Sequence, residues 1–272
     1  MDLNGTIESA EKKFIQILEG FFISVYPEKE LPSHDLSHHR RVWNTAKELI
    51  LIAAEDNRFT DPRLIQSLLI ASFLHDIGMA TDRSPSHGMK SMELCKLFLA
   101  KNNLNESDFP GLLKAVLEHD NKDYSESSEI TVHSLLSVAD DLDAFGFTGI
   151  YRYIEIYSIR GIEEAEMAAK IRENSEKRYR HFEHLFFSHK ELVQKHRKRY
   201  EILDSFFTAY NMQLRKGEDT GCIRVVRLLL QIVQNSENLN NLIQRYQNDE
   251  DQIVRSFFAG ISSEMCSRKE DL

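Results

Sequence analysis

Apolar residues spaced three and four positions apart run through most of the chain and predict helices almost throughout. One such stripe consists of Val42, Ala46, Leu49, Ile50 and Ala53. Residues at this spacing share one face of an α-helix, and Ser33 or Asp35 upstream can cap its first turn. No stretch alternates apolar and polar residues for long enough to predict a strand. We therefore expect an all-α protein.

Prolines separate the predicted helices in the first part of the chain. All five prolines lie in the first 110 residues, and each stands between two helical patterns. Asp61-Pro62 is expected to be the cap and the first position of an apolar helix that ends at Leu74. Pro110-Gly111 likewise precedes a helix, and another runs from Ile130 to Phe145 and ends near Gly146.

The second half of the chain has fewer breaks and predicts longer helices. A charged helix pair is expected from about Glu163 to Leu214, and the segment Lys216 to Gly221 is the clearest interruption. Beyond it, Cys222 to Gln234 is strongly apolar, and two or three amphipathic helices close the chain. The expected organisation is an N-terminal helix over 1–29, a main helical domain over 30–214 and a C-terminal helical extension over 215–272.

Composition and charge narrow the class of protein. At 272 residues, with 42% apolar and 28% charged residues, the chain has the composition of a globular protein with a sizeable core. Its net charge of −9 does not suggest binding to nucleic acid through a basic surface. A phosphorylated ligand is still compatible with an acidic protein when a metal ion and a few arginines reverse the field locally.

The cysteines and the apolar runs bear on the cellular compartment. Cys95, Cys222 and Cys266 are widely spaced and form no Cys-x-x-Cys pair. This argues against a disulfide framework or a zinc–thiolate site and fits a reducing cytosol. The N-terminal residues show no basic region followed by an apolar run, so no signal peptide is expected. No run of about 20 apolar residues predicts a membrane span, and we expect a cytoplasmic protein.

The most informative local feature is the doublet His75-Asp76, which directly follows a long apolar helix. A histidine and an aspartate in succession are an unusual way to end a helix for packing alone. An imidazole nitrogen and a carboxylate oxygen together suit a divalent transition metal or magnesium. The doublet therefore predicts a metal-dependent site.

Three further metal-competent side chains stand on the apolar faces of other predicted helices. His38 and His119 each lie one helical turn from a buried-face valine, so both point inward. Asp140 lies partly on a buried face, where a carboxylate is costly unless it is paired or bound to a metal. Helical bundles commonly build metal sites from side chains on facing helices. These residues are therefore candidates to join the His75-Asp76 doublet in one site.

The same residues occur in the order of a known signature. His34 to Val42 (His-Asp-Leu-Ser-His-His-Arg-Arg-Val) resembles the opening His-Asp-x-x-His-x-x-Arg-Val of the HD-domain superfamily of metal-dependent phosphohydrolases. Leu74 to Gly78 resembles the doublet that names the family, and Ala139 to Gly146 resembles its final Ala-Asp-x-Leu-Asp-Ala segment. Tyr179 to Phe207 is similar to the C-terminal helices of the bacterial branch that hydrolyses nucleotides. The resemblance covers about residues 30–210.

The resemblance implies an HD-domain helical bundle with additional C-terminal helices, and a set of metal ligands. His87, which is expected to open the next helix, and His119 resemble the extra histidines of branches that hold two metals. The implied ligand set is His38, His75, Asp76, His87, His119 and Asp140. Six ligands can hold one or two divalent ions, with Asp76 as the bridge, and Mn, Fe and Mg are all compatible with them. His87 has an alternative role in binding phosphate or donating a proton.

The resemblance also implies hydrolysis of a phosphate ester or anhydride, with a nucleotide as the expected substrate. The metal lowers the pKa of a bound water and polarises a phosphoryl oxygen. Asp76 is a catalytic residue in this scheme, and Asp143, one turn beyond Asp140, is a candidate to orient a ligand or accept a proton. Its alternative is a capping or supporting carboxylate. A cyclic dinucleotide is disfavoured because Asp120 stands where that branch has a second histidine.

Several side chains are candidates to contact the substrate. Arginine's planar fork suits phosphate oxygens, and the candidate phosphate-binding residues are Arg41, Arg83, Lys90 and Arg152. For each, the alternative is an exposed charge that keeps the protein soluble. The segment 79–86 is expected to shape specificity as a loop on a rigid scaffold, with Asp82 as a candidate proton carrier. Trp43 and Tyr151 are candidates to stack on a base, although Trp43 is more in keeping with the core.

The remaining histidines are expected to be hydrogen-bonded core or surface side chains, with the last four of them solvated: His39, His133, His181, His184, His189 and His196.

Two other classes of function remain open at this point. One is a catalytically silent HD module that senses a nucleotide, although pseudoenzymes commonly lose a ligand and this set is complete. The other is an oxygenase built on a two-iron variant of the fold, which iron content and oxygen uptake would identify. Residues 215–272 are a candidate dimerisation element. The expected partner is otherwise a phosphorylated small molecule, with no nucleic acid and no membrane.

Overall fold

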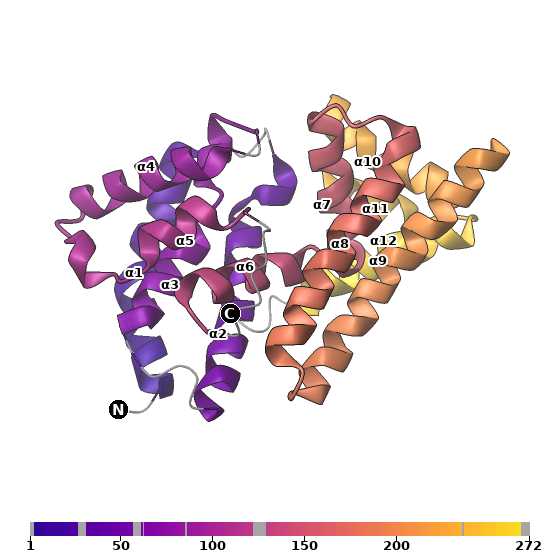
Figure 1. The fold of residues 1–272 in the computed structure, drawn as a ribbon. Coiled ribbons are helices and arrows are strands. Elements are labelled where there is room, and N and C mark those ends of the chain that lie inside the picture. Colours follow the sequence, from indigo (N-terminus) through magenta and orange to yellow (C-terminus); the bar gives the residue numbers. More distant parts are fainter. Residues whose placement is uncertain are drawn as a thin grey trace. The chain divides into compact units, whose positions relative to one another are not determined.

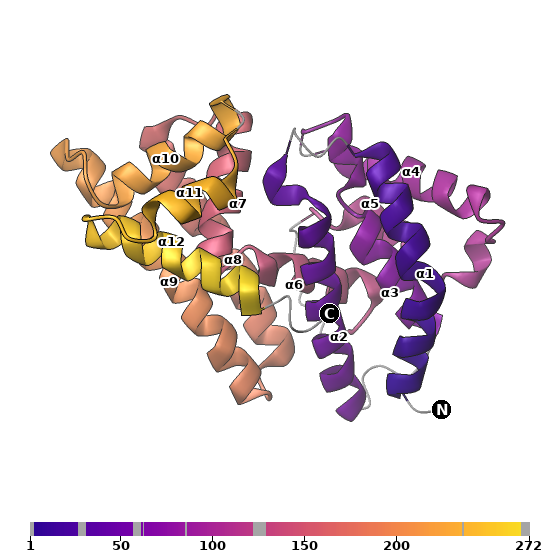
Figure 2. The same cartoon turned by 180° about the vertical axis from the view of Figure 1, so that it is seen from behind.

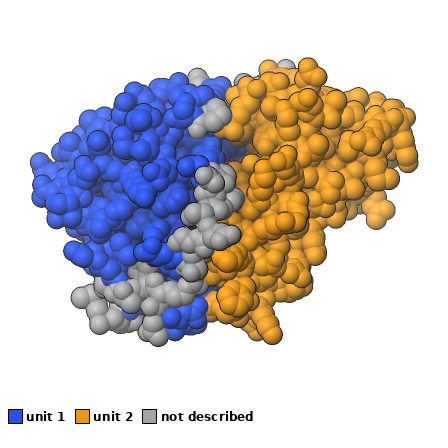
Figure 3. All heavy atoms as spheres, in the orientation of Figure 1, with its two compact units in different colours: residues 1–140 blue, residues 141–272 orange. Residues whose placement is uncertain are grey.

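The computed structural model describes residues 3–26, 31–56, 61, 63–84, 86–121, 129–235 and 237–267. Within these residues the chain forms twelve α-helices and three short 3₁₀ helices, with no strand (Figure 1). The predicted all-α class is therefore confirmed, while the HD-domain bundle stays a prediction. The chain divides into two compact units, residues 1–140 and 141–272, which Figure 3 shows in different colours.

Unit 1 is built around helix α3, whose second half is fully buried. Its elements are α1 (Leu3–Val25), η1 (Pro32–His34), α2 (Leu36–Glu55), α3 (Arg63–Leu74), η2 (Ile77–Ala80), α4 (His87–Lys101), η3 (Glu106–Asp108), α5 (Leu112–Glu118) and the part of α6 (Val132–Asp143) up to Asp140. Helix α3 contacts α1, α2, α4 and α5 (Figure 2). Every residue from Ser67 to Leu74 is buried. The end of α3, which carries His75-Asp76, is therefore held from several sides.

The helix starts in unit 1 follow from local capping. The carboxylate of Asp35 accepts a hydrogen bond from the backbone N–H of His38 at 3.1 Å, so α2 begins where the sequence predicts. Asp61 accepts from the backbone N–H of Arg63 at 3.0 Å, as expected of the cap of α3. Pro62 lies outside the described residues. Helix α5 follows Gly111, whose φ of +78° suits glycine.

The helix predicted over Ile130–Phe145 is shorter than expected and is followed by one more. α6 ends at Asp143, and α7 (Gly146–Ile159) begins directly at the glycine, which has a φ of +73°. The left-handed conformation turns the chain, so the glycine separates two helices rather than closing one. Glu264 of α12 (Gln252–Ser267) caps α7, because its carboxylate accepts from the backbone N–H groups of Phe147 at 3.0 Å and Thr148 at 2.9 Å.

Unit 2 contains the predicted charged helix pair and the closing helices. Besides α7 and α12, its helices are α8 (Glu164–Phe186), α9 (Lys190–Lys216), α10 (Cys222–Asn235) and α11 (Leu239–Tyr246). The two units divide the chain at a different place from the predicted boundaries at 29/30 and 214/215. Helix α1 packs on α3 within unit 1, and α10 packs on α7 and α9 within unit 2. A domain over 30–214 stays a prediction.

Two further findings bear on the compartment. Cys95 and Cys222 are buried free thiols, and the side chain of Cys266 lies outside the described residues. Among the helices that the structure describes, none combines the length and the apolar character that crossing a membrane requires. The cytoplasmic location stays a prediction.

Candidate metal centre

The six predicted ligands converge in unit 1, and each is at most 5% exposed. They come from separate elements: His38 from α2, His75 and Asp76 from the turn between α3 and η2, His87 from the first residue of α4, His119 from the end of α5 and Asp140 from α6. The convergence expected from the inward-facing positions is therefore observed. Within the described residues the ligands form two overlapping groups.

The four-ligand group consists of His38, His75, Asp76 and Asp140. The Nε2 atoms of His38 and His75 are 3.3 Å apart, and they lie 3.6 and 3.3 Å from Oδ2 of Asp76. Oδ1 of Asp140 lies 3.7 and 3.9 Å from the same two nitrogens. Two imidazole nitrogens and two carboxylate oxygens thus face one small volume.

The three-ligand group consists of Asp76, His87 and His119. Oδ1 of Asp76 lies 2.9 Å from the Nε2 atom of each histidine, and the two nitrogens are 3.1 Å apart. Asp76 therefore belongs to both groups, with Oδ2 toward the four-ligand group and Oδ1 toward the three-ligand group. A carboxylate in this position can bridge two cations.

Backbone carbonyls fix the tautomers of three ligand histidines, His75, His87 and His119. Nδ1 of His75 lies 3.1 Å from the Ser72 carbonyl, Nδ1 of His87 lies 2.9 Å from the Ser84 carbonyl, and Nδ1 of His119 lies 2.8 Å from the Val116 carbonyl. A carbonyl oxygen only accepts, so each Nδ1 carries the hydrogen. The lone pair of each neutral ring is then on Nε2, which faces the cluster. Metal-binding histidines commonly have this outer hydrogen bond.

The donor set fits a divalent cation. With Nδ1 protonated, the Nε2 lone pairs of His87 and His119 point at each other and at a carboxylate oxygen, which is repulsive unless protons or a cation intervene. Ligands about 2.1 Å from one ion are themselves about 3.0–3.4 Å apart. The separations in the three-ligand group are 2.9 and 3.1 Å, and those in the four-ligand group begin at 3.3 Å. Both groups can therefore hold a metal ion.

Without metal, the cluster holds protons instead. Burial opposes a charge on His75, but the carboxylates of Asp76 and Asp140 outweigh it and raise the pKa of His75 to about 10. Burial is likewise outweighed at His87, where Asp76 raises the pKa. Burial also disfavours charge on Asp76, yet the surrounding histidines hold the pKa of that carboxyl well below its usual range. Metal and protons therefore compete for the same nitrogens.

This competition predicts a pH-dependent metal affinity. Below a pH of about 10, a metal ion that binds at the four-ligand group must displace the proton that His75 holds in the metal-free protein. The dissociation constant for the metal should therefore fall about tenfold for each unit that the pH rises between 6.5 and 9, for each proton displaced. Titration with Mn²⁺ across this range, with proton release followed in a pH-stat, measures both quantities. An affinity that is constant over the range, without proton release, would contradict the expectation.

Two glycines make the short connection from Asp76 to His87 possible. A Cβ atom on Gly78 would lie 2.5 Å from the His87 carbonyl oxygen, and one on Gly88 would lie 2.3 Å from the Leu117 carbonyl oxygen. The backbone N–H of Gly78 also donates to Ser91 Oγ at 2.9 Å. Turn η2 therefore lies directly on α4, and α4 lies directly on α5, which brings His87 to the doublet.

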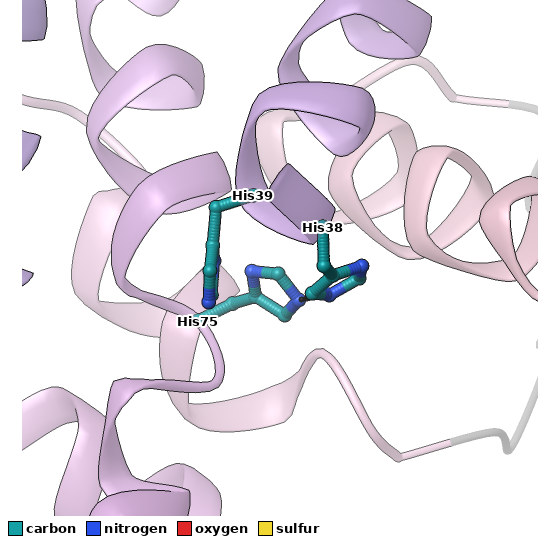
Figure 4. A group of neighbouring side chains, drawn as sticks. All are labelled: His38, His39 and His75. Atoms are coloured by element: carbon teal, nitrogen blue, oxygen red, sulfur yellow. Dashed lines mark hydrogen bonds between the residues drawn. The ribbon is translucent and has the colours of Figure 1, made fainter. Parts of the chain in front are cut away.

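Two other histidines, which were not among the predicted ligands, lie beside them. Nε2 of His34 is 3.9 Å from Oδ2 of Asp76, and the side chain is buried. His39 is fully buried, and a nitrogen from each of His38, His39 and His75 lies within 4.8 Å of the others (Figure 4). The available signal for His34 was its place in the opening motif. For His39, the available signal was its place three residues before Val42, on the apolar stripe of the same helix.

The predicted catalytic residue Asp143 belongs to unit 2. Its carboxylate is buried and pairs with Arg152, whose Nη1 lies 3.2 Å away. Arg152, a predicted phosphate-binding residue, is buried as well. A buried pair of this kind is what the alternative reading of Asp143 as a supporting carboxylate anticipates. The catalytic role of Asp143 and the phosphate contact of Arg152 stay predictions.

The other predicted phosphate-binding residues lie in unit 1. Nη1 of Arg41 donates to Ser37 Oγ at 2.9 Å, and the exposed ammonium of Lys90 pairs with Glu93 at 2.7 Å. Arg83 is partly buried between η2 and α4. Their substrate contacts stay predictions.

The predicted specificity segment 79–86 is ordered in part by hydrogen bonds. The carboxylate of Asp82 accepts from the backbone N–H of Ser84 at 2.9 Å, and the Ser84 carbonyl in turn orients His87. Asp82 thus supports the turn that leads into the three-ligand group. Pro85 lies outside the described residues, and a proton-carrying role for Asp82 stays a prediction.

Three aromatic side chains are buried, in part against expectation. Trp43 is a core residue, as expected, and its Nε1 donates to Glu11 at 2.7 Å. Tyr151 is buried and its hydroxyl donates to Glu155 at 3.2 Å. His196 was expected to be solvated, but it is buried against the Phe182 ring, with centroids 5.3 Å apart. The pairing of α8 with α9 covers one face of this otherwise charged segment.

The geometry of the two groups is the basis on which a function can be assigned. The HD-domain resemblance rests on the sequence motifs that contain the residues of these two groups. Comparison of the chain with protein-family models, with curated proteins and with solved structures gave no match.

Proposed function

We propose that this protein is a metal-dependent phosphohydrolase of the HD-domain kind, which cleaves a phosphate ester or anhydride of a nucleotide. The observation that carries the proposal is the double role of Asp76, whose two oxygens face two buried groups of imidazole nitrogens. Two cations bridged in this way can stabilise the attacking and the leaving oxygens of a phosphoryl transfer. The nucleotide as substrate class follows from the resemblance of residues 179–207.

The chain's own residues have separable roles in this proposal. Asp76 and Asp140 supply the negative charge that retains a dication, and the neutral rings of His38 and His75 supply nitrogen ligands. The three-ligand group leaves coordination positions to water or substrate. A divalent ion bound there supplies Lewis-acid polarisation of a phosphoryl oxygen and a lowered pKa for the attacking water. Because all these side chains are buried, their electrostatic interactions are little screened by solvent.

The test is release of phosphate or pyrophosphate from a panel of substrates with Mn²⁺ added. The panel contains nucleoside triphosphates, nucleoside monophosphates and phosphorylated small molecules. We expect release from at least one nucleotide, loss of that activity after chelation, and its return when Mn²⁺ is restored.

A different result would redirect the assignment. A protein that binds metal tightly but releases phosphate from no member of the panel would contradict hydrolysis. Oxygen uptake by the iron-loaded protein would then favour the oxygenase, and nucleotide binding without turnover would favour the sensing module.

A further inference from the structure

His39 is a buried side chain next to the ligand His38 that the proposed function does not use. Its Nδ1 atom lies 3.1 Å from the Ser72 carbonyl oxygen, and because that oxygen only accepts, Nδ1 carries the hydrogen. Its Nε2 atom is buried and has no hydrogen-bond partner. An imidazole that leaves one nitrogen unsatisfied in the interior destabilises the fold, which favours a role that compensates for this cost.

The carbonyl that His39 binds is the one that orients His75. Nδ1 of His75 donates to the same Ser72 oxygen, also at 3.1 Å, so the two lone pairs of one carbonyl are shared between the two rings. Ser72 lies in the last turn of α3, where carbonyl groups lack partners within the helix. The ring of a metal ligand is therefore held by an oxygen that His39 also holds.

The two rings are also in contact. The His75 ring lies between those of His38 and His39 in Figure 4, with centroids 5.3 Å from His38 and 5.1 Å from His39. The Phe22 ring of α1 also contacts the His39 ring, with centroids 4.6 Å apart. His39 is thus fixed by packing from α1 and by a hydrogen bond from α3, and it leaves His75 little room to turn.

We propose that His39 is a positioning residue for the four-ligand group, which holds the Ser72 carbonyl and the His75 ring so that Nε2 of His75 faces the metal. This inference rests on the proposed metal binding. His39 acts through His75 rather than as a ligand, because the group that it forms with His38 and His75 contains no carboxylate to retain a cation. Outer hydrogen-bond partners of this kind typically change metal affinity about 10- to 100-fold.

A matched pair of variants separates the hydrogen bond from the packing. The side chains of Leu and Asn have the same branching, but the Asn amide can donate from nearly the position of the imidazole Nδ1. We expect His39→Leu to weaken Co²⁺ binding about 10- to 100-fold and to shift the visible absorption bands of bound Co²⁺. We expect His39→Asn to keep both close to the wild-type values. Circular dichroism establishes that each variant is folded.

A measurement on the wild-type protein keeps the inference testable if a variant does not fold. In the Zn²⁺-loaded protein, long-range ¹H–¹⁵N correlation spectra should report the Nδ1–H tautomer for both His39 and His75. An Nε2–H tautomer at His39, or a metal bound to His39, would overturn the proposal. Equal weakening in the Leu and Asn variants, or none in either, would overturn it too, with metal binding itself intact. A wild-type protein that binds no metal would instead overturn the proposed function and this inference together.

Discussion

Asp76→Ala should abolish metal binding at both groups and lower turnover by more than about 10³-fold. Removal of a single stabilising donor from an active site typically costs roughly 10²- to 10³-fold, and this variant removes more than one. Both carboxylate oxygens face buried imidazole nitrogens, at 2.9 Å on one side and 3.3 Å on the other. No other residue belongs to both groups that the structure describes.

The measurement combines metal analysis with the hydrolysis assay. Purified Asp76→Ala should contain less than one tenth of the metal of the wild type after dialysis against Mn²⁺, and circular dichroism should show a helical protein. Asp108→Ala is the matched control, because this carboxylate is exposed on η3 in the same unit; it should keep wild-type metal content and turnover. Retention of one full equivalent of metal in Asp76→Ala would contradict the bridging role.

The sequence predicted much of this centre because ligand chemistry and helical periodicity coincide in it. His38 and Asp140 stand on apolar stripes, and His75-Asp76 ends the most apolar helix of unit 1. A buried imidazole or carboxylate needs a partner, so such positions are informative without any knowledge of the fold. The order of these residues along the chain is the basis of the resemblance to the HD-domain superfamily, and membership of that superfamily stays an expectation.

The parts that could not be predicted depend on contacts between distant segments. His39 lies three residues before Val42 on the apolar face of the same helix, but helical spacing does not show which rings and carbonyls it meets on that face. It is buried because Phe22 of α1 and Ser72 of α3 cover that face. His196 is buried for the same kind of reason, since Phe182 of the neighbouring helix covers it.

The approach of His87 to Asp76 is the most consequential of these tertiary effects. A spacing of 11 residues does not by itself indicate whether a turn and a helix can fold back so closely. The close approach depends on two glycines that permit backbone contact, Gly78 against α4 and Gly88 against α5. Their effect depends on which segments meet there, which single-sequence periodicity does not report.

Gly88→Ala should therefore remove the three-ligand group while the four-ligand group persists. The new methyl group would lie 2.3 Å from the Leu117 carbonyl oxygen, and a backbone oxygen cannot turn aside as a side chain can. Helix α4 must then shift from α5, which separates His87 from His119, whose Nε2 atoms are now 3.1 Å apart. The overpacking itself should cost about 1–3 kcal/mol of stability. His38, His75 and Asp140 come from other elements and should be little affected.

Metal stoichiometry makes this expectation specific. If the wild type binds two equivalents of Mn²⁺, as the proposed function requires, Gly88→Ala should bind one. Its turnover should fall by about 10-fold or more, because the cation of the three-ligand group would no longer polarise the phosphoryl oxygen or lower the pKa of the attacking water. Gly20→Ala is the control, since a Cβ there meets nothing within 4 Å; this change in α1 should raise stability by about 0.5–1 kcal/mol and keep two equivalents. A Gly88→Ala protein with two equivalents and full turnover would mean that the close approach of α4 to α5 is not what holds His87 against Asp76.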